Sequence, residues 1–311
     1  MKIVNICKSD WANFSYDNCM ALQSVGIDCS SYAVTPHVFD YPSHATIIKT
    51  AQIYSVCSDA DIIQIFHSDY SCLDIVKPLG KKLVVYHTGS GYRSESEKLN
   101  NLFNPFLDIS FTALGELMNK GAKNEFYIVG AIDTNEIVPI PIESNIPVFS
   151  HYPSKSNVKG TDTITHIMKE IGKRNKFIFN YNEKDIRLSL SEQRSKMQNC
   201  DIYIELLKPE LNGNKYGSWG ITALEAAAMG KIVVTQNLSN EVYEKHYGGC
   251  PLILVADEHD FIKKINWLLS LTKKEIRNLQ EQTRTWVEEK HSYKATGEYL
   301  KNILCDTILL T

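Results

Sequence analysis

The stretch 215–235, which reads KYGSWGITALEAAAMGKIVVT, constrains the fold of this chain more than any other. A loop with two glycines, Gly217 and Gly220, leads into an alanine-rich segment that predicts a helix, and Gly230 is placed to end it. The β-branched run 232–235 then predicts a buried strand. This order of loop, helix and strand is half of a doubly wound α/β sheet, in which ligands bind at the loops beyond the carboxyl ends of the strands.

The same stretch predicts a nucleotide site. The N-terminus of a helix offers free backbone N–H groups to a phosphate. Glu225 lies one to two turns into the predicted helix, where its carboxylate can accept hydrogen bonds from a ribose. We expect this carboxylate to be hydrated when no nucleotide is bound. The alternative is a solvated glutamate on an ordinary helix of an α/β sheet.

Residues 224–234, LEAAAMGKIVV, resemble the second half of the E-x7-E signature of GT-B glycosyltransferases, in particular the retaining, GT4-like group. The first half departs from it, because Gly217 stands where the leading glutamate is expected. The resemblance implies an α/β fold of two Rossmann-like doubly wound domains that face each other across a cleft, with a C-terminal helix crossing back to the first. The residues that it assigns to the sugar-nucleotide donor are Gly217, Ser218, Trp219, Gly220 and Glu225.

Short β-rich runs alternate with helix-like segments along the chain, which indicates parallel sheets covered by helices on both faces. The predicted strands are 3–7, 61–66, 82–87, 108–112, 125–129, 148–151, 176–180, 201–205, 231–235 and 252–255, and the clearest helical segments are 13–25, 70–79, 94–104 and 273–304. Prolines at 139, 141, 147 and 153 predict a connection between two halves. We therefore expect an acceptor-side domain at 1–145, a nucleotide-sugar-binding domain at 146–290 and a returning C-terminal helix at 291–311.

The segment 151–162, HYPSKSNVKGTD, is similar to the turn after the first strand of the donor domain in GT4-like enzymes. The resemblance implies that the lysine of the Lys-Gly pair, Lys159, clamps the diphosphate and acts in catalysis, with Lys155 as a second cation. Two ammonium groups beside a helix N-terminus suit a leaving diphosphate, whose negative charge grows as the glycosidic bond breaks. The alternative is that both lysines are solvent-facing residues of a surface loop.

The segment 82–93, KLVVYHTGSGYR, predicts a strand that ends in a polar loop, and it resembles the His-x-Gly-Ser-Asp-x-Arg loop of GT4-like enzymes. The resemblance implies that His87 is a catalytic residue near the donor sugar, where an imidazole can carry charge close to neutral pH. A strand-end histidine bonded to the backbone is the alternative. Arg93 either contacts a phosphate or sugar group or pairs with a neighbouring glutamate such as Glu95.

The first loop of the chain, 7–14, follows the first predicted strand and contains no glycine. Its polar and aromatic residues Asp10, Trp11 and Asn13 are candidates for contacts with the sugar or the acceptor. The same residues make equal sense as caps of the following helix. Ser30-Ser31-Tyr32 is interpreted as a turn.

Composition and motif searches exclude several other classes. The net charge of −3 gives no global field that would attract nucleic acid, and no apolar run approaches the ~20 residues of a membrane span. The eight cysteines are dispersed, so we expect reduced thiols in a cytoplasmic protein, and no metal site. No G-x-G-x-x-G follows a predicted strand, so the dehydrogenase fingerprint is missing.

The function predicted from these features is transfer of a sugar from a nucleoside diphosphate sugar, such as a UDP- or GDP-sugar, to a hydroxyl acceptor, with no cofactor. Retention of configuration follows from the GT4-like resemblance alone. The acceptor stays open between a glycan, a small molecule, a protein and a hydroxymethylated DNA base of a phage, and the Lys-, Asn- and Ile-rich composition is a weak hint toward the last. The second hypothesis is a GT-B module that binds nucleotide sugars without transferring them.

Overall fold

The computed structural model describes residues 1–37, 41–182, 186 and 188–309. The chain divides into two compact units. The first holds Met1–Asp133 and the C-terminal segment from His291, and the second holds Thr134–Lys290. Residues 134–145, which the sequence analysis placed in the first domain, are grouped with the second unit.

The first unit is built on a seven-stranded sheet with the order β3-β2-β1-β4-β5-β6-β7, and all its strand pairs are parallel. The strands are β1 (Lys2–Ser9), β2 (Asp28–Thr35), β3 (Thr46–Ile47), β4 (Ile62–Ile65), β5 (Lys82–His87), β6 (Ile109–Thr112) and β7 (Glu125–Tyr127). The chain first moves from β1 to β2 and β3 and then crosses to β4 on the other side of β1. The strand order therefore reverses between β1 and β4, which is the position where doubly wound sheets bind ligands.

Helices cover this sheet because their apolar residues bury against the β-branched strands. They are α1 (Phe14–Ser24), α2 (Ile53–Cys57), α3 (Leu73–Val76), α4 (Gly89–Phe103) and α12 (Tyr293–Leu304). On one face of the sheet, the strand residues Val4, Ile63 and Val85 belong to a continuous core that also contains Phe103 of α4.

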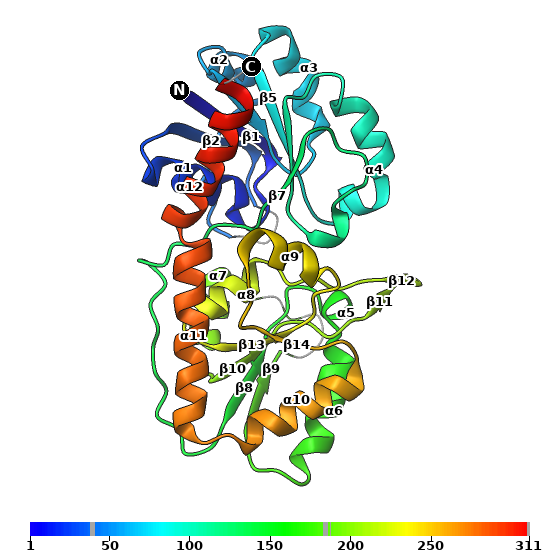
Figure 1. Cartoon of the computed structure of the whole chain (residues 1–311), viewed down its shortest axis with the longest axis vertical. Coiled ribbons are helices and arrows are strands. Elements are labelled where there is room, and N and C mark those ends of the chain that lie inside the picture. The colour runs from blue at the N-terminus through cyan, green and yellow to red at the C-terminus, as the bar shows by residue number, and fades with distance from the viewer. Residues whose placement is uncertain (38–40, 183–185, 187, 310–311) are drawn as a thin grey trace. The chain divides into compact units, whose positions relative to one another are not determined.

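The C-terminal helix α12 belongs to this unit and lies beside α1 (Figure 1). The two helices approach so closely that a Cβ on Gly297 would lie 2.1 Å from the carbonyl oxygen of Ala21. The hydroxyl of Tyr293 donates to Asp17 Oδ1 over 2.7 Å. The prediction of a terminal helix that returns to the first domain is confirmed, and the segment 273–304 is helical as predicted, in two helices. It is divided at Ser292, whose hydroxyl caps α12 by accepting from the N–H of Ala295.

The interpretation of Ser30-Ser31-Tyr32 as a turn is wrong, because these residues lie inside β2. Strand β2 pairs with β1 along most of its length. The hydroxyls of Ser31 and Ser15 are 2.9 Å apart, so the polar side chain finds a partner on α1 when it is buried. From the sequence alone, consecutive serines suggest a turn, because the sequence does not show the hydrogen-bond partner that allows a serine to be buried in a strand.

The second unit is built on a five-stranded parallel sheet with the order β14-β13-β10-β8-β9. Its strands are β8 (Val148–His151), β9 (Ile178–Tyr181), β10 (Ile202–Ile204), β13 (Ile232–Thr235) and β14 (Ile253–Leu254), and a separate antiparallel pair joins β11 (Glu210–Leu211) to β12 (Asn214–Lys215). Within the unit the order along the sheet is fifth, fourth, third, first, second. The switch point of this sheet therefore lies between β8 and β10.

The helices of the second unit pack on both faces of its sheet (Figure 1). They are α5 (Ser156–Lys159), α6 (Thr161–Gly172), α7 (Leu190–Gln198), α8 (Ile221–Ala228), α9 (Asn240–Tyr247), α10 (Glu258–Ser270) and α11 (Lys273–His291). Gly230 follows α8 at φ +68°, and β13 begins two residues later. The predicted sequence of loop, helix and parallel strand is therefore present.

Both units are α/β with parallel sheets, as the sequence predicts. Among the residues that the structure describes, no helix is both long and apolar enough to cross a bilayer. All eight cysteines are free thiols.

Candidate functional site

The switch point of the second sheet brings the predicted lysine loop to the end of β10. The backbone N–H of Leu207 donates to the carbonyl of Lys159 over 3.2 Å. Gly160 has φ +74°, and a Cβ there would lie 1.8 Å from the carbonyl oxygen of Leu207. Only glycine fits this turn. The position of the Lys-Gly pair is therefore determined by the backbone packing at Gly160 and not by contacts of the lysine side chain.

Lys159 forms an ion pair with Glu205, a residue that the sequence analysis did not select. Its Nζ donates to Glu205 Oε1 over 2.6 Å, and the Glu205 side chain is 1% exposed, against 19% for that of Lys159. The same Oε1 accepts from the backbone N–H of Gly220 over 3.3 Å, and Oε2 accepts from the hydroxyl of Thr235 over 2.6 Å. An ammonium group and the backbone N–H of the N-cap residue of α8 therefore converge on one anion, which in this structure is a carboxylate.

A sequence signal for Glu205 existed. It directly follows the buried strand β10, and a carboxylate in that place stands at the carboxyl end of a central strand. Lys155, the second predicted cation, lies at the N-cap of α5 in the same loop and has an exposed side chain.

The loop with Gly217 and Gly220 leads into α8 as predicted. The backbone conformation of this loop also gives a reason why position 217 is a glycine and not the leading glutamate of the signature. Gly217 has φ +123°, and a Cβ there would lie 3.0 Å from Gln236 Oε1. A glutamate would strain the backbone and crowd this side chain. Ser218 forms an isolated antiparallel β-bridge with Asn237, on the loop after β13. Gly220 is the N-cap of α8.

Trp219 was expected to contact the donor, but the structure buries it. Its side chain is 4% exposed and packs edge-on against Tyr243 and Trp286, with ring centroids 5.4 and 5.8 Å away. The indole therefore anchors the loop on α9 and α11 instead of facing a ligand.

Glu225 is buried and paired, which contradicts the expectation of a hydrated carboxylate. Its Oε1 accepts from Arg194 Nε at 3.0 Å and Nη2 at 2.9 Å. Arg194 lies on α7 and also bonds Glu136 through Nη1 at 3.2 Å. Burial raises the pKa of Glu225, while Arg194 lowers it. The spacing of residues along α8 could not predict Arg194 as the partner of Glu225, because Arg194 lies on another helix, α7.

At the switch point of the first sheet, the loop after β1 folds into the cap of α1. Asp10 accepts from the backbone N–H groups of Ser15 (2.8 Å) and Tyr16 (2.9 Å). Asn13 is buried at φ +53°, and its Oδ1 accepts from the N–H of His44. The capping alternative therefore describes Asp10 better than a sugar contact does. Trp11, also in this loop, has an exposed side chain, at 42%.

His67, at the end of β4, completes this group and was not selected from the sequence. Its Nδ1 lies 2.9 Å from Thr88 Oγ1, while its Nε2 accepts from the N–H of Trp11 and lies 3.5 Å from Asp10 Oδ1. His67 and its neighbour Ser68 have φ of +61° and +54°, a left-handed conformation that few non-glycine residues adopt. Its place directly after a predicted strand was the available signal.

His87, which was expected to be a catalytic residue, is buried in this structure. The side chain is fully buried, stacks on Tyr92 with ring centroids 4.0 Å apart, and lies within hydrogen-bond distance of Ser68 through Nδ1. Burial lowers its pKa from 6.5 to about 3, so the ring is neutral at physiological pH. The ring packs inward from the strand, so it is uncharged here, whereas the sequence analysis allowed it to carry a charge. Arg93 pairs with Glu116 at 2.6 Å, a different partner from the expected Glu95.

One group of potential metal ligands occurs among the described residues. Cys7 Sγ, Asp10 and His67 lie within 4.8 Å of one another. Both oxygens of Asp10 already accept backbone N–H groups, and burial raises the pKa of the Cys7 thiol well above its usual range. A protonated thiol and a carboxylate that already accepts two hydrogen bonds are poor ligands.

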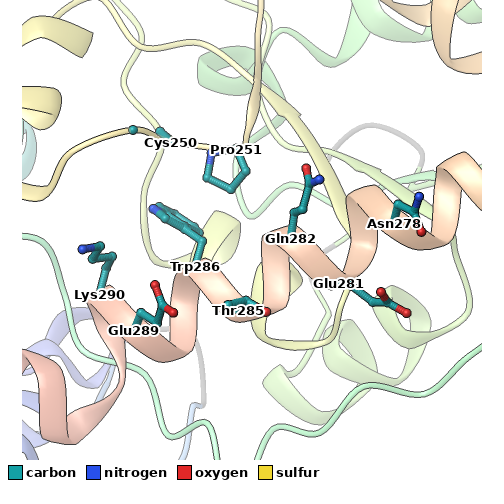
Figure 2. Close-up of a pocket in the computed structure, with 10 residues that line it drawn as sticks. Cys250, Pro251, Asn278, Glu281, Gln282, Thr285, Trp286, Glu289 and Lys290 are labelled. Atoms are coloured by element: carbon teal, nitrogen blue, oxygen red, sulfur yellow. The ribbon is translucent and has the colours of Figure 1, made fainter.

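Two cavities of the second unit do not involve the predicted residues. Figure 2 shows one of about 700 Å³, which lies between α11 and the segment of Cys250 and Pro251. The other, of about 1010 Å³, is lined mainly by the proline-rich connection and α11. None of the predicted donor-binding residues lines either cavity, so the candidate functional residues are those at the switch point of each unit.

A scan against protein-family models finds none that matches the chain, and a comparison with curated proteins finds no relative. Solved structures do match. HepE of Anabaena in complex with UDP-glucose has 13% identity and a TM-score of 0.69, over 98% of this chain and 100% of that one. A glycosyltransferase of Rickettsia africae has 13% identity and a TM-score of 0.68, over 100% and 99%.

Sucrose-phosphate synthase of Thermosynechococcus elongatus also matches, with 10% identity and a TM-score of 0.64 over the whole of both chains. At these identities the likeness concerns the fold. The chain has the two-sheet α/β architecture of GT-B glycosyltransferases.

Proposed function

We propose that this protein is a glycosyltransferase that takes a sugar from a nucleoside diphosphate sugar, with UDP-sugars as the first donors to test, and passes it to a hydroxyl acceptor. The observation that carries the proposal is the anion-binding point at the second switch point. There the ammonium group of Lys159 and the N–H of Gly220 at the start of α8 meet. An oxygen of a diphosphate has the charge and acceptor geometry that these donors bind.

The fold supports the same donor class. HepE, which shares the fold, has been solved with UDP and with UDP-glucose. We assign the diphosphate to Lys159, with Lys155 reaching from the same exposed loop, and the ribose to Glu225. Ribose binding at Glu225 requires the hydroxyls to share the carboxylate with Arg194 or to displace the guanidinium.

In the first unit, Trp11 is proposed as the contact for a sugar or acceptor ring, because it is an exposed aromatic side chain beside the strained backbone of His67. The acceptor, whether glycan, small molecule or modified DNA base, stays open. Retention of configuration and independence of metal are part of the proposal and rest on the GT4-like resemblance.

A nucleotide-sugar-binding module without transfer activity is the second candidate. It is favoured by Gly217, which removes the leading carboxylate of the signature, and by the burial of His87.

The deciding experiment measures UDP binding and sugar transfer together. Calorimetry with UDP, GDP and their sugars identifies the donor, and release of nucleoside diphosphate in the presence of an acceptor panel, with EDTA added, tests transfer. We expect binding and metal-free turnover in the wild type. In Lys159→Ala we expect UDP binding that is weaker but measurable, and a larger loss of turnover, because the charge of the leaving diphosphate is greatest in the transition state. Lys263→Ala, which removes an exposed lysine of α10, is the matched control. Binding without turnover on any acceptor would favour the module. Turnover that disappears in EDTA and returns with Mn²⁺ would overturn the metal-free part.

A further inference from the structure

Glu205 stands where the proposed donor would place its diphosphate. Its Oε1 occupies the two donors assigned to phosphate, Lys159 Nζ at 2.6 Å and Gly220 N–H at 3.3 Å. Its Oε2 is held separately by the hydroxyl of Thr235 at 2.6 Å. One oxygen of this carboxylate therefore competes with a ligand, and the other ties the side chain to the end of β13.

The backbone positions of the two residues do not depend on the attraction between their side chains. The backbone bond from Leu207 N–H to the Lys159 carbonyl and the close approach of Gly160 fix the lysine loop next to β10. Lys159 keeps one side toward solvent, at 19% exposure, while Glu205 is enclosed at 1%. A ligand can therefore reach the ammonium group while Glu205 stays in place behind it.

We propose that Glu205 is a positioning residue that acts as a built-in occupant of the diphosphate site. It holds the Lys159 ammonium in the binding position when no donor is present, and it weakens the hold of the site on the nucleoside diphosphate that remains after transfer. This inference rests on the proposed function, and it assigns to that site a means of releasing its charged product.

The physical basis is electrostatic competition. A phosphate oxygen that binds Lys159 must share the ammonium with a carboxylate only 2.6 Å away. Two anions close to one cation repel each other, and this repulsion is strong where water is largely excluded. Removing the charge of Glu205 while keeping its shape should leave Lys159 wholly available to the ligand.

The test is calorimetric titration of UDP and of uridine, which lacks the phosphates, into wild type and Glu205→Gln. We expect UDP to bind the variant at least tenfold more tightly, with uridine unchanged. In a Lys159→Met background, Glu205→Gln should change UDP affinity by less than threefold, because the shared cation is gone. In steady-state assays the variant should lower kcat together with KM, as product release slows.

Asp201→Asn is the matched control, because it neutralises another partly buried carboxylate at the amino end of the same strand, where Asp201 accepts from the N–H of Val148. It should leave UDP affinity unchanged. Thermal melts verify that each variant folds, and Glu205→Met, which keeps the volume without charge, replaces Glu205→Gln if that variant does not.

Two outcomes separate the inference from the function beneath it. UDP affinity that is unchanged or weaker in a folded Glu205→Gln would overturn the proposal and make Glu205 a structural group or a direct donor ligand. A wild type that binds neither UDP nor GDP would instead overturn the proposed function.

Discussion

At the scale of single residues, the charged groups expected to face ligands are mostly paired within the protein. Glu225 accepts two bonds from Arg194, Lys159 binds Glu205, and Asp10 caps α1. Each pairing offsets the cost of removing a charge from water. Substitutions at these positions are therefore expected to change the stability of the protein, in addition to any effect on the proposed ligand binding.

Glu225→Gln should destabilise the protein by about 1–2 kcal/mol, because it removes the charge from a buried acceptor that Arg194 contacts twice. The partial exposure of Arg194 limits the loss. Urea unfolding of Glu225→Gln, Arg194→Met and the double variant measures the coupling. Additive losses would show that the pair contributes nothing. UDP and 2′-deoxy-UDP, titrated into the same proteins, report separately whether Glu225 binds ribose.

Two buried histidines should make the protein less stable in mild acid. Burial lowers the pKa of His87 to about 3 and that of His151 to about 4. The unfolded chain takes up these protons below pH 6.5, while the native protein does not. Stability is therefore complete above pH 6.5 and is lost as the pH falls toward 4, by about 1.4 kcal/mol per histidine at pH 5.5.

His87→Phe keeps a ring against Tyr92 and removes the titrating group. Its unfolding free energy should fall less than that of the wild type between pH 7.5 and 5.5, by about 1.4 kcal/mol. His259→Gln, at an exposed position, is the control. An unchanged pH dependence in His87→Phe would mean that His87 is protonated in the native protein.

At the scale of elements, helix α12 depends on one glycine. A Cβ on Gly297 would lie 2.1 Å from the carbonyl oxygen of Ala21, so Gly297→Ala must push α12 away from α1. We expect a loss of about 1–3 kcal/mol, measured by thermal and urea unfolding. Gly91→Ala, on α4 of the same unit, introduces a Cβ into open space and should cost nothing. Equal effects of the two substitutions would contradict close packing of α12.

At the scale of the whole molecule, the two switch points lie in different units, so nucleotide and acceptor contacts should be separable. Hydrogen exchange should slow on UDP addition in the segments 154–161 and 217–223, which carry the lysine loop and the start of α8. Segments 10–16 and 66–69 of the first unit should respond less. Protection confined to the first unit would place the nucleotide at the other switch point.

Local sequence determined the strands whose side chains are buried on both faces of a sheet. The runs at 62–65 and 232–235 are β-branched and have few other ways to hide their side chains, so they were predicted within a residue or two. The alternation of strands and helices then dictated parallel sheets, and the loop into α8 could be placed because glycines and a helix start are local features.

Tertiary structure alone decided what the site residues do. Glu205 and Arg194 find their partners 46 and 31 residues away, across strands and helices whose neighbours no local pattern records. His87 and Trp219 match a functional pattern, but their side chains turn inward because the packing around each ring buries it. The free energy of a charge or an aromatic ring depends on what surrounds it in space, and that is fixed only when distant segments meet.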